Sequence, residues 1–156
     1  MVGAACCYAL FHDHFIAAEA TLKPGETMAS KYSGLFCTYP NISNKYAVWS
    51  EFICTLCLLL VIMGINDERM TPATQHKPIA IGILVFLIGL CPGWCTGYAM
   101  NPARDFGPRL VTVFLWGSEP LTLNDHYFVV PLLVPFLGAF AGVLLYVLTV
   151  VSKVKV

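Results

Sequence analysis

Three long apolar runs limit the folds open to this chain: Val48–Ile65, Ile79–Cys95 and Tyr127–Val151. Glu51 is the only charged residue inside them, although the sequence contains nine basic and nine acidic side chains. A helix needs about 17–25 mainly apolar residues to cross the hydrocarbon core of a bilayer. All three runs reach that length, so the sequence predicts an integral, multi-pass membrane protein of the all-α class.

Composition argues against several other functions. Hydrophobic residues make up 58% of the sequence and charged residues 12%, whereas an ordinary soluble domain is about 45–50% apolar and about 25% charged. The net charge is zero, so we expect no nucleic-acid partner, which would require a basic face. Cys54-x-x-Cys57 has no histidine, aspartate or second cysteine pair nearby, so we interpret it as helix packing. With no HExxH, GxSxG or paired-carboxylate motif, the sequence predicts no enzyme, metal site or cofactor.

The chain divides into segments of different character. Met1–Phe11 is apolar from its first residue, which is typical of the end of a transmembrane helix rather than of a whole one. Turn-forming residues such as Pro40 mark a polar connection after it, and Asn41 begins an N-x-S glycosylation sequon. We expect the end of a helix over 1–18, a connecting loop over 19–46, helices over 47–66, 78–97 and 127–151, and a re-entrant loop and half-helix over 98–116.

The re-entrant segment contains Asn101, Pro102, Ala103 and Arg104 in succession. Asn is a favoured N-cap and Pro is favoured at the first helical position, so a helix is expected to begin here. A capping Asn accepts a backbone N–H through its oxygen and keeps its NH₂ group free to donate. The helix N-terminus and Arg104 add positive potential, and Pro108 is expected to kink or end the helix. Such donors at the tip of a re-entrant half-helix are typical of a pore for neutral polar solutes that repels cations and protons.

Two interpretations of this motif are open from the residues alone. In the simpler one, Asn101-Pro102 is an ordinary turn and Arg104 is an interfacial side chain that reaches toward the lipid headgroups. In the other, an ionisable group at membrane depth marks a functional site. The neighbouring residues favour the second interpretation.

Those neighbours resemble a known family. Gly97–Arg109 resembles the second signature loop of the aquaporin family, and Phe36–Pro40 resembles the F-x-T-Y-P sequence before the fourth helix of glycerol facilitators. Glu51 occupies the position of a membrane-buried glutamate that braces the signature loop in that family. The resemblance extends from the last part of the family's third helix to its sixth. It implies the second inverted repeat of the aquaporin fold, with the first repeat mostly absent.

Four positions resemble the glycerol-conducting branch of the family, the aquaglyceroporins. Asp105 directly follows Arg104, and the basic Arg109 comes four positions later; water-selective members usually have small residues at these places. Pro131 and Leu132 replace an aromatic pair at the start of the last helix. The resemblance therefore implies a pathway suited to glycerol.

The resemblance also implies a constriction. Arg104 would hold solute hydroxyls, Tyr98 would form an aromatic wall, and Gly89 would make room where water-selective members have histidine. From spacing alone, Gly89 could equally be a packing glycine in a helix. Two further pairs are interpreted as helix-contact faces: Gly93/Gly97 and Gly138/Gly142.

The implied function is passive transport of glycerol, water and small neutral solutes across a membrane, with ions and protons excluded. The family's pore needs two N-P-A elements, and this sequence contains one, so we expect these 156 residues alone not to conduct. The alternative is a naturally truncated, non-conducting subunit that associates with full-length channels and modulates them. Expected partners are the lipid bilayer, the transported solutes and, for the full-length form, further copies in a homotetramer of the plasma membrane.

Overall fold

The structure is a computed structural model that describes residues 1–69 and 75–153. Within these ranges the chain forms helices joined by turns and loops, without a strand, so the all-α prediction is confirmed. The helices are α1 (Val2–Leu10), α2 (His12–Glu19), α3 (Met28–Tyr32), α4 (Asn44–Asn66), α5 (Lys77–Leu90), α6 (Pro102–Trp116), α7 (Glu119–His126) and α8 (Val129–Thr149). Short 3₁₀ segments are η1 (Ser33–Leu35), η2 (Pro92–Cys95) and η3 (Val151–Lys153).

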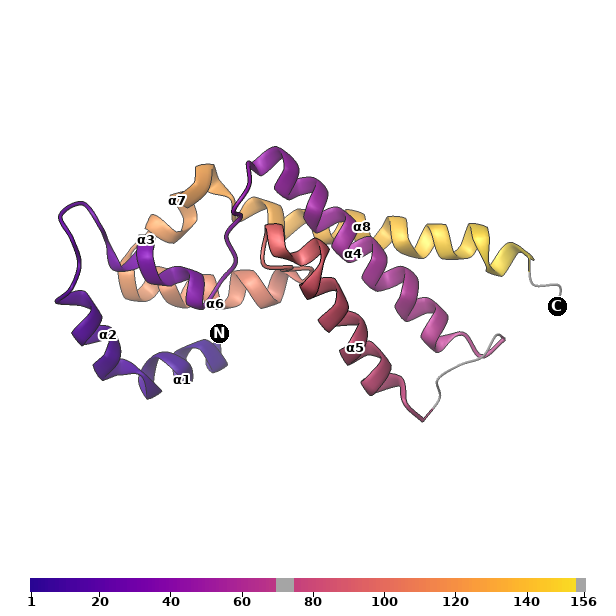
Figure 1. Ribbon diagram of the computed structural model, residues 1–156, viewed down its shortest axis with the longest axis horizontal. Coiled ribbons are helices and arrows are strands. Elements are labelled where there is room, and N and C mark those ends of the chain that lie inside the picture. Colours follow the sequence, from indigo (N-terminus) through magenta and orange to yellow (C-terminus); the bar gives the residue numbers. More distant parts are fainter. Residues whose placement is uncertain (70–74, 154–156) are drawn as a thin grey trace.

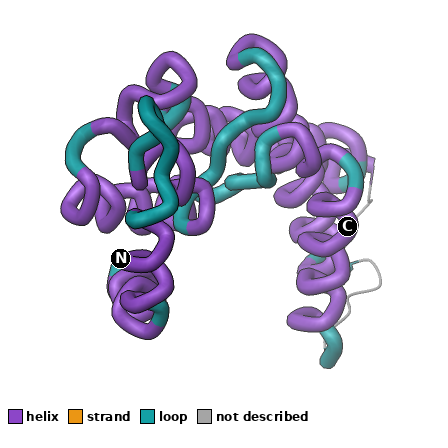
Figure 2. Tube along the Cα trace, turned by 60° about the vertical axis from the view of Figure 1, so that its left-hand side comes forward, coloured by secondary structure: helices purple, strands orange, loops and turns teal. Residues whose placement is uncertain are grey.

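The helices gather at two ends of an elongated molecule. In Figure 1, α4, α5 and α8 lie toward the C-terminal end, while α1, α2, α3, α6 and α7 lie toward the opposite end. Figure 2 shows the same division from another side, with the arm that holds the N-terminus separate from the arm that holds the C-terminus. The segments that lead into α4 and α6 lie between the two groups.

Within the described residues, two helical segments are long and apolar enough to cross a membrane. They are α4, with a mean hydropathy of 2.2, and Val129–Lys153, which contains α8 and has a mean hydropathy of 2.3. The helix predicted over 78–97 is shorter, because α5 ends at Leu90 after 14 residues. Cys91 has φ −117° and ψ −85°, outside helical geometry. The residue before a proline is disfavoured in the α region, and Pro92 follows directly, so the apolar run continues as a 3₁₀ turn.

The most extensive helix pair is that of α4 and α8. Two glycines of α8 make the contact close. A Cβ atom added at Gly138 would lie 2.6 Å from the carbonyl oxygen of Phe52, and one at Gly142 would lie 2.5 Å from that of Leu56. Because both distances are too short for a side-chain carbon, the two backbones can approach this closely only at glycine. The interpretation of Gly138 and Gly142 as a helix-contact face is confirmed.

The corresponding interpretation of Gly93 and Gly97 is wrong. Both residues lie beyond the end of α5, in the turn that leads to the residues before α6. A Cβ atom at Gly93 would lie 2.6 Å from Cδ1 of Tyr98, and Gly97 has a φ of +80°, a left-handed conformation that favours glycine. These glycines shape a turn rather than a helix face, because Pro92 has already ended the helix.

The N-terminal arm differs from the prediction in two places. Its helix breaks at Phe11, so that α1 and α2 are separate. The loop predicted over 19–46 contains a further helix, α3, because Thr27 and Ser30 form a capping box at its start. A cluster of aromatic rings joins this arm to α6: Tyr8, Phe15, Phe36 and Trp116.

Pro108 does not end α6, which runs for 15 residues. Proline removes one main-chain hydrogen bond, but Asp105 and Arg109 form a buried ion pair across the same turn and support it. The chain then reverses at Gly117, with a φ of +81°, and enters α7, which the sequence did not predict. Residues 124–126 at the end of α7 have positive φ values of 53°, 53° and 58° and lead into α8.

Candidate functional site

A buried carboxylate from α4 holds the loop 97–101, which connects η2 to α6. Glu51 is fully buried, and its two oxygens accept hydrogen bonds from the backbone N–H groups of Ala99 and Met100, both at 2.9 Å. Tyr98 and Met100 have positive φ values of 41° and 49°, a conformation that is uncommon for residues other than glycine. Glu51 therefore stabilises a loop conformation that these residues disfavour on their own.

The same hydrogen bonds set the direction of two carbonyl groups. In a trans peptide unit the N–H and the C=O point in opposite directions, and no described peptide bond is cis. The N–H groups of Ala99 and Met100 point toward Glu51. The carbonyls of Tyr98 and Ala99 belong to the same peptide units, so they point away from Glu51 and present two acceptors on the opposite side of the loop.

The start of α6 presents hydrogen-bond donors. As the sequence predicts, Asn101 is the N-cap and Pro102 is the first helical residue. The side-chain oxygen of Asn101 accepts a hydrogen bond from the N–H of Ala103 at 2.9 Å. Asn101 is exposed, and its NH₂ group makes no hydrogen bond to any residue that the structure describes, so it is free to donate outward.

Gly89, Tyr98 and Arg104, predicted at a constriction, lie together. The Cζ atom of Arg104 is 5.8 Å from the centroid of the Tyr98 ring. A Cβ atom added at Gly89 would lie only 3.0 Å from Cζ of Tyr98. The tyrosine ring thus takes part of the room that the missing side chain of Gly89 leaves, a coupling that sequence reasoning on the separate residues did not reveal.

Arg104 and Tyr98 border a pocket of about 280 Å³. One side of this pocket is formed by Gly97, Tyr98 and Arg104, and the other by residues 34–39 of the segment before α4. Arg104 is exposed and makes no ion pair with any residue in the described ranges. Its positive charge is therefore directed at the pocket without a bound counter-ion from the protein.

Asp105 and Arg109 form a buried ion pair, with 2.8 Å between Nε of Arg109 and Oδ1 of Asp105. Thr38 completes the network: its N–H and its hydroxyl each donate to Oδ2 of Asp105 at 2.6 Å, and its carbonyl accepts from Arg109 at 2.7 Å. Arg109 also donates to the carbonyl of Pro120 at 2.9 Å, and its Cζ lies 4.6 Å from the centre of the Tyr39 ring. Sequence reasoning did not single out Thr38 or Pro120; the F-x-T-Y-P stretch was the one signal that marked this segment.

Three other predicted residues lie away from this pocket. Pro131 is buried in α8, and Leu132 lines a separate hollow with Ala103. Asn41 is exposed, but its side-chain amide donates to the carbonyl of Trp94 at 3.2 Å. A glycan would replace one of the two hydrogens on this nitrogen and leave the other to donate, and glycosylation at this position stays a prediction.

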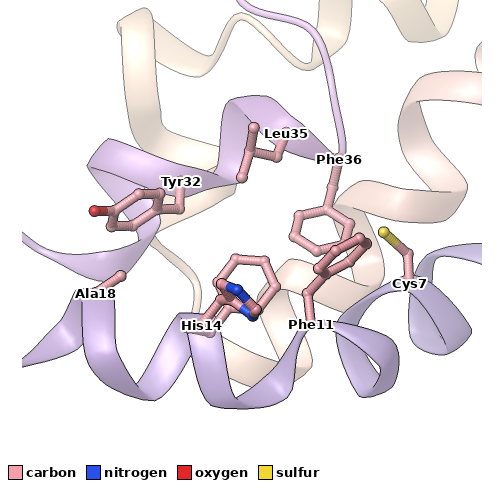
Figure 3. A pocket seen from close by; sticks show the side chains of 8 residues that line it. Cys7, Phe11, His14, Ala18, Tyr32, Leu35 and Phe36 are labelled. Carbon is pink, nitrogen blue, oxygen red and sulfur yellow. The ribbon is translucent and has the colours of Figure 1, made fainter.

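A second hollow, of about 370 Å³, lies between the N-terminal arm and the segment that contains α3 and η1 (Figure 3). Its lining is mainly apolar and includes Phe11, His14, Leu35 and Phe36. None of the residues predicted at the constriction lines it. The pocket beside Arg104, which Tyr98 and Arg104 line, is therefore the candidate site, while Asn101 lines a separate hollow together with Met100.

One known protein family matches most of this chain. The family described as Major intrinsic protein matches residues 1–146. The chain belongs to the major intrinsic protein family. Members of this family are integral membrane channels rather than enzymes.

Relatives within the major intrinsic proteins support the aquaglyceroporin resemblance. Aquaglyceroporin-3 of Trypanosoma brucei brucei is 45% identical over 150 residues, which are 93% of this chain and 48% of that protein. The glycerol uptake facilitator protein of Haemophilus influenzae is 40% identical over 153 residues, 92% of this chain and 57% of that protein. The X-ray structure of the aquaglyceroporin from Plasmodium falciparum matches with a TM-score of 0.76 and 29% identity, covering 96% of this chain and 59% of that one. The chain spans about half the length of the curated relatives it matches.

Proposed function

We propose that this chain forms one side of a membrane pathway through which glycerol, water and other small neutral solutes pass, while ions and protons are excluded. The arrangement of donors and acceptors around the loop 97–101 supports this proposal. The carbonyls of Tyr98 and Ala99 are acceptors, and Asn101 and Arg104 are donors. A polyol hydroxyl both donates and accepts, so these groups can replace the water around a solute with several hydroxyls. The names of the aquaglyceroporin and glycerol-facilitator relatives support the same solute class.

The electrostatics of the site favour neutral solutes over cations. Arg104 contributes a full positive charge, and the N-terminus of α6 contributes about half an elementary charge. Asp105 does not offset Arg104, because its carboxylate is paired with Arg109 at 2.8 Å. The Glu51 carboxylate is bound to the N–H groups of Ala99 and Met100 rather than to Arg104, so a cation or hydronium ion that reaches Arg104 meets a positive charge that no described residue pairs.

We assign the other site residues supporting roles. Arg104 holds solute hydroxyls, the Tyr98 ring guides the carbon chain, and Gly89 gives that ring its place. Pro102 and Ala103 fix the start of α6 and thereby the donors at its tip. The residues that resemble the glycerol branch support the half-helix and the start of α8: Asp105, Arg109, Pro131 and Leu132.

We further propose that the chain corresponds to the second inverted repeat of the family fold. The end of the third helix would be α1 and α2, the fourth to sixth helices would be α4, α5 and α8, and the half-helix would be α6. Asn101 and Arg104 are exposed in this structure, and polar donors that face lipid are costly. The chain alone is therefore expected not to conduct, and a first repeat would cover the site in a homotetrameric channel of the plasma membrane.

Solute flux tests the proposal. The protein made from its complete coding sequence should pass glycerol and water in proteoliposomes, and the 156-residue chain alone should pass neither. Arg104→Leu should lower glycerol flux and raise proton leak, because the positive potential is lost. Arg69→Leu is the matched control, since Arg69 pairs with Asp67 outside the candidate site. A complete protein that passes neither solute would refute the channel, and flux through the 156-residue chain would refute its need for a second half.

The mass of the native protein separates the channel from the alternative. An antibody to residues 23–45 would detect it in its source membranes. A deglycosylated species clearly larger than 17.1 kDa supports a channel that contains both repeats. A species of 17.1 kDa supports a non-conducting subunit that associates with full-length channels.

A further inference from the structure

The two walls of the pocket beside Arg104 come from distant parts of the chain. Gly97, Tyr98 and Arg104 form the first wall, and residues 34–39 form the second. Glu51 braces the loop of the first wall through two backbone N–H groups. The second wall begins within the short η1, which follows α3, and continues without regular structure toward α4. The gap between the walls therefore depends on what ties this segment to α6.

Thr38 provides that tie. Its N–H and hydroxyl donate to Oδ2 of Asp105, both at 2.6 Å, and its carbonyl accepts from Arg109 at 2.7 Å. All three residues are at most 5% exposed. In the part of the chain that the structure describes, no other residue of 34–39 forms a hydrogen bond with Asp105. The N–H, the hydroxyl and the carbonyl of Thr38 thus all form hydrogen bonds with Asp105 or Arg109, the two buried charged residues of α6.

The contact between Thr38 and Asp105 lies next to Arg104, the residue proposed to hold the solute. Asp105 follows Arg104 directly in the first turn of α6. Successive residues of a helix point about 100° apart, so Arg104 can border the pocket while Asp105 turns to Thr38. Arg104 and Asp105 belong to the same rigid turn of α6. A hydrogen bond that fixes Thr38 relative to Asp105 therefore also fixes its distance from Arg104.

We infer that Thr38 is a positioning residue for solute selection, which holds the second wall of the pocket at the spacing that glycerol requires. The inference rests on the proposed function and concerns the same site. Glycerol must fit its carbon chain and several hydroxyls between both walls at once, whereas a water molecule needs one partner at a time. Loosening the second wall therefore impairs glycerol passage more than water passage.

The test is the ratio of glycerol to water permeability, measured on the same proteoliposomes with the protein made from its complete coding sequence. Thr38→Val keeps the shape of the side chain and removes its hydroxyl donor to a buried carboxylate. We expect this variant to lower the ratio by about fivefold or more, in line with the loss of a hydrogen bond to a charged group. Thr38→Ser restores the hydroxyl and should return the ratio to within about twofold of the native one.

Thr112→Val is the matched control. Thr112 is fully buried in α6, but its hydroxyl donates to the carbonyl of Arg109 at 2.7 Å within its own helix, and it does not line the pocket. A purely structural effect would lower both permeabilities together and leave the ratio unchanged. We expect Thr112→Val to behave in that way.

The outcomes separate this inference from the proposed function. A native protein that passes neither solute refutes the channel itself. A channel whose ratio is the same in native and Thr38→Val proteins, or falls equally in Thr112→Val, overturns only the role of Thr38. Should Thr38→Val not fold, Thr38→Cys offers a near-isosteric side chain with a weaker donor; a lowered ratio supports the inference and a native ratio overturns it.

Discussion

Glu51 and Asp105 are both buried carboxylates that hold the region where α6 begins, and they have different partners. Glu51 accepts two backbone N–H groups at 2.9 Å and has no ion-pair partner among the described residues. Asp105 pairs with Arg109 and also accepts the N–H and hydroxyl of Thr38. The first arrangement sets the orientation of peptide units within one loop. The second sets the spacing between segments that are far apart in the sequence, so loop geometry and wall spacing are controlled by separate groups.

The difference in partners also predicts different mutational costs. When one member of a buried ion pair is removed, the other remains as an uncompensated charge. When an acceptor of backbone hydrogen bonds is weakened, what remains is a neutral group without a partner, which costs less. The Asp105 network should therefore be the more sensitive of the two.

Arg109→Met should cause the largest loss. Asp105 would stay buried without its cation, the carbonyl of Thr38 would lose its donor, and that of Pro120 would keep only the Tyr39 hydroxyl at 3.2 Å. We expect the free energy of unfolding in detergent micelles to fall by about 3–5 kcal/mol. The double variant Asp105→Asn/Arg109→Met removes both charges and should be less destabilised than the sum of the single variants. If Arg109→Met lost no more unfolding free energy than Glu51→Gln, the Asp105 network would not be the more sensitive of the two.

Glu51→Gln should have the next largest effect. The amide keeps one oxygen but places an NH₂ donor against a backbone N–H, so either Ala99 or Met100 loses its acceptor. We expect a loss of about 2–3 kcal/mol in unfolding free energy, together with reduced glycerol flux. Glu68→Gln, at an exposed carboxylate, is the control and should stay within about 0.5 kcal/mol of the native value. Equal behaviour of the two variants would show that Glu51 does not brace the loop.

Local signals made part of the fold predictable. The lengths of α4 and α8 follow from apolar runs, and the start of α6 follows from the capping chemistry of Asn101 and Pro102. The end of α5 was missed although its cause is local, because the apolar run continues past Pro92 and conceals the break. α7 was missed because its short sequence lacks a strong apolar pattern and depends on packing against α3 and α6.

Only part of the candidate site was predictable, because some of its contacts join residues that are distant in the sequence. The spacing of Asp105 and Arg109 is that of an i,i+4 pair on one helix, which sequence alone can suggest. Their contact with Thr38 joins residues 67 positions apart, and no periodicity reports such a pairing. The role of Glu51 was likewise expected from family resemblance and not from its position in an apolar helix.

Gly138→Ala tests the helix contact that positions Glu51. An added Cβ atom would lie 2.6 Å from the carbonyl of Phe52, the residue after Glu51, so α4 must move away from α8. We expect a loss of about 1–3 kcal/mol in unfolding free energy. Glycerol flux should also fall, while the hydrogen bonds between Thr38 and Asp105 should persist. Gly82→Ala is the matched control, because nothing lies within 4 Å of an added Cβ atom there, and it should be neutral or slightly stabilising. Similar losses in both variants would mean that the effect is not specific to this contact.

Asp67 is a third carboxylate, which accepts four hydrogen bonds from Arg69 and Tyr146, and it should show the smallest effect. The backbone N–H of Arg69 donates to it at 3.0 Å. Two nitrogens of Arg69 donate to it at 2.9 and 2.8 Å, and the hydroxyl of Tyr146 donates at 2.7 Å. The side chain of Arg69 is 47% exposed, however, so solvent screens this pair in a way that it does not screen Asp105 and Arg109. Asp67→Asn should therefore destabilise the protein less than Arg109→Met, Glu51→Gln or Gly138→Ala.

The pH dependence of the Asp67→Asn effect identifies its cause. Hydrogen bonds from Arg69 and then from Tyr146 hold the pKa of Asp67 well below its ordinary value of 3.8. Because the folded-state pKa is the lower one, the stabilisation is present above the ordinary pKa and is lost as the pH falls through the folded-state value. The difference in unfolding free energy between native and Asp67→Asn proteins should thus be constant from about pH 7 to pH 5 and shrink in stronger acid. A loss in Asp67→Asn that persists unchanged in strong acid would mean that packing, not charge, links α4 to α8 at this end.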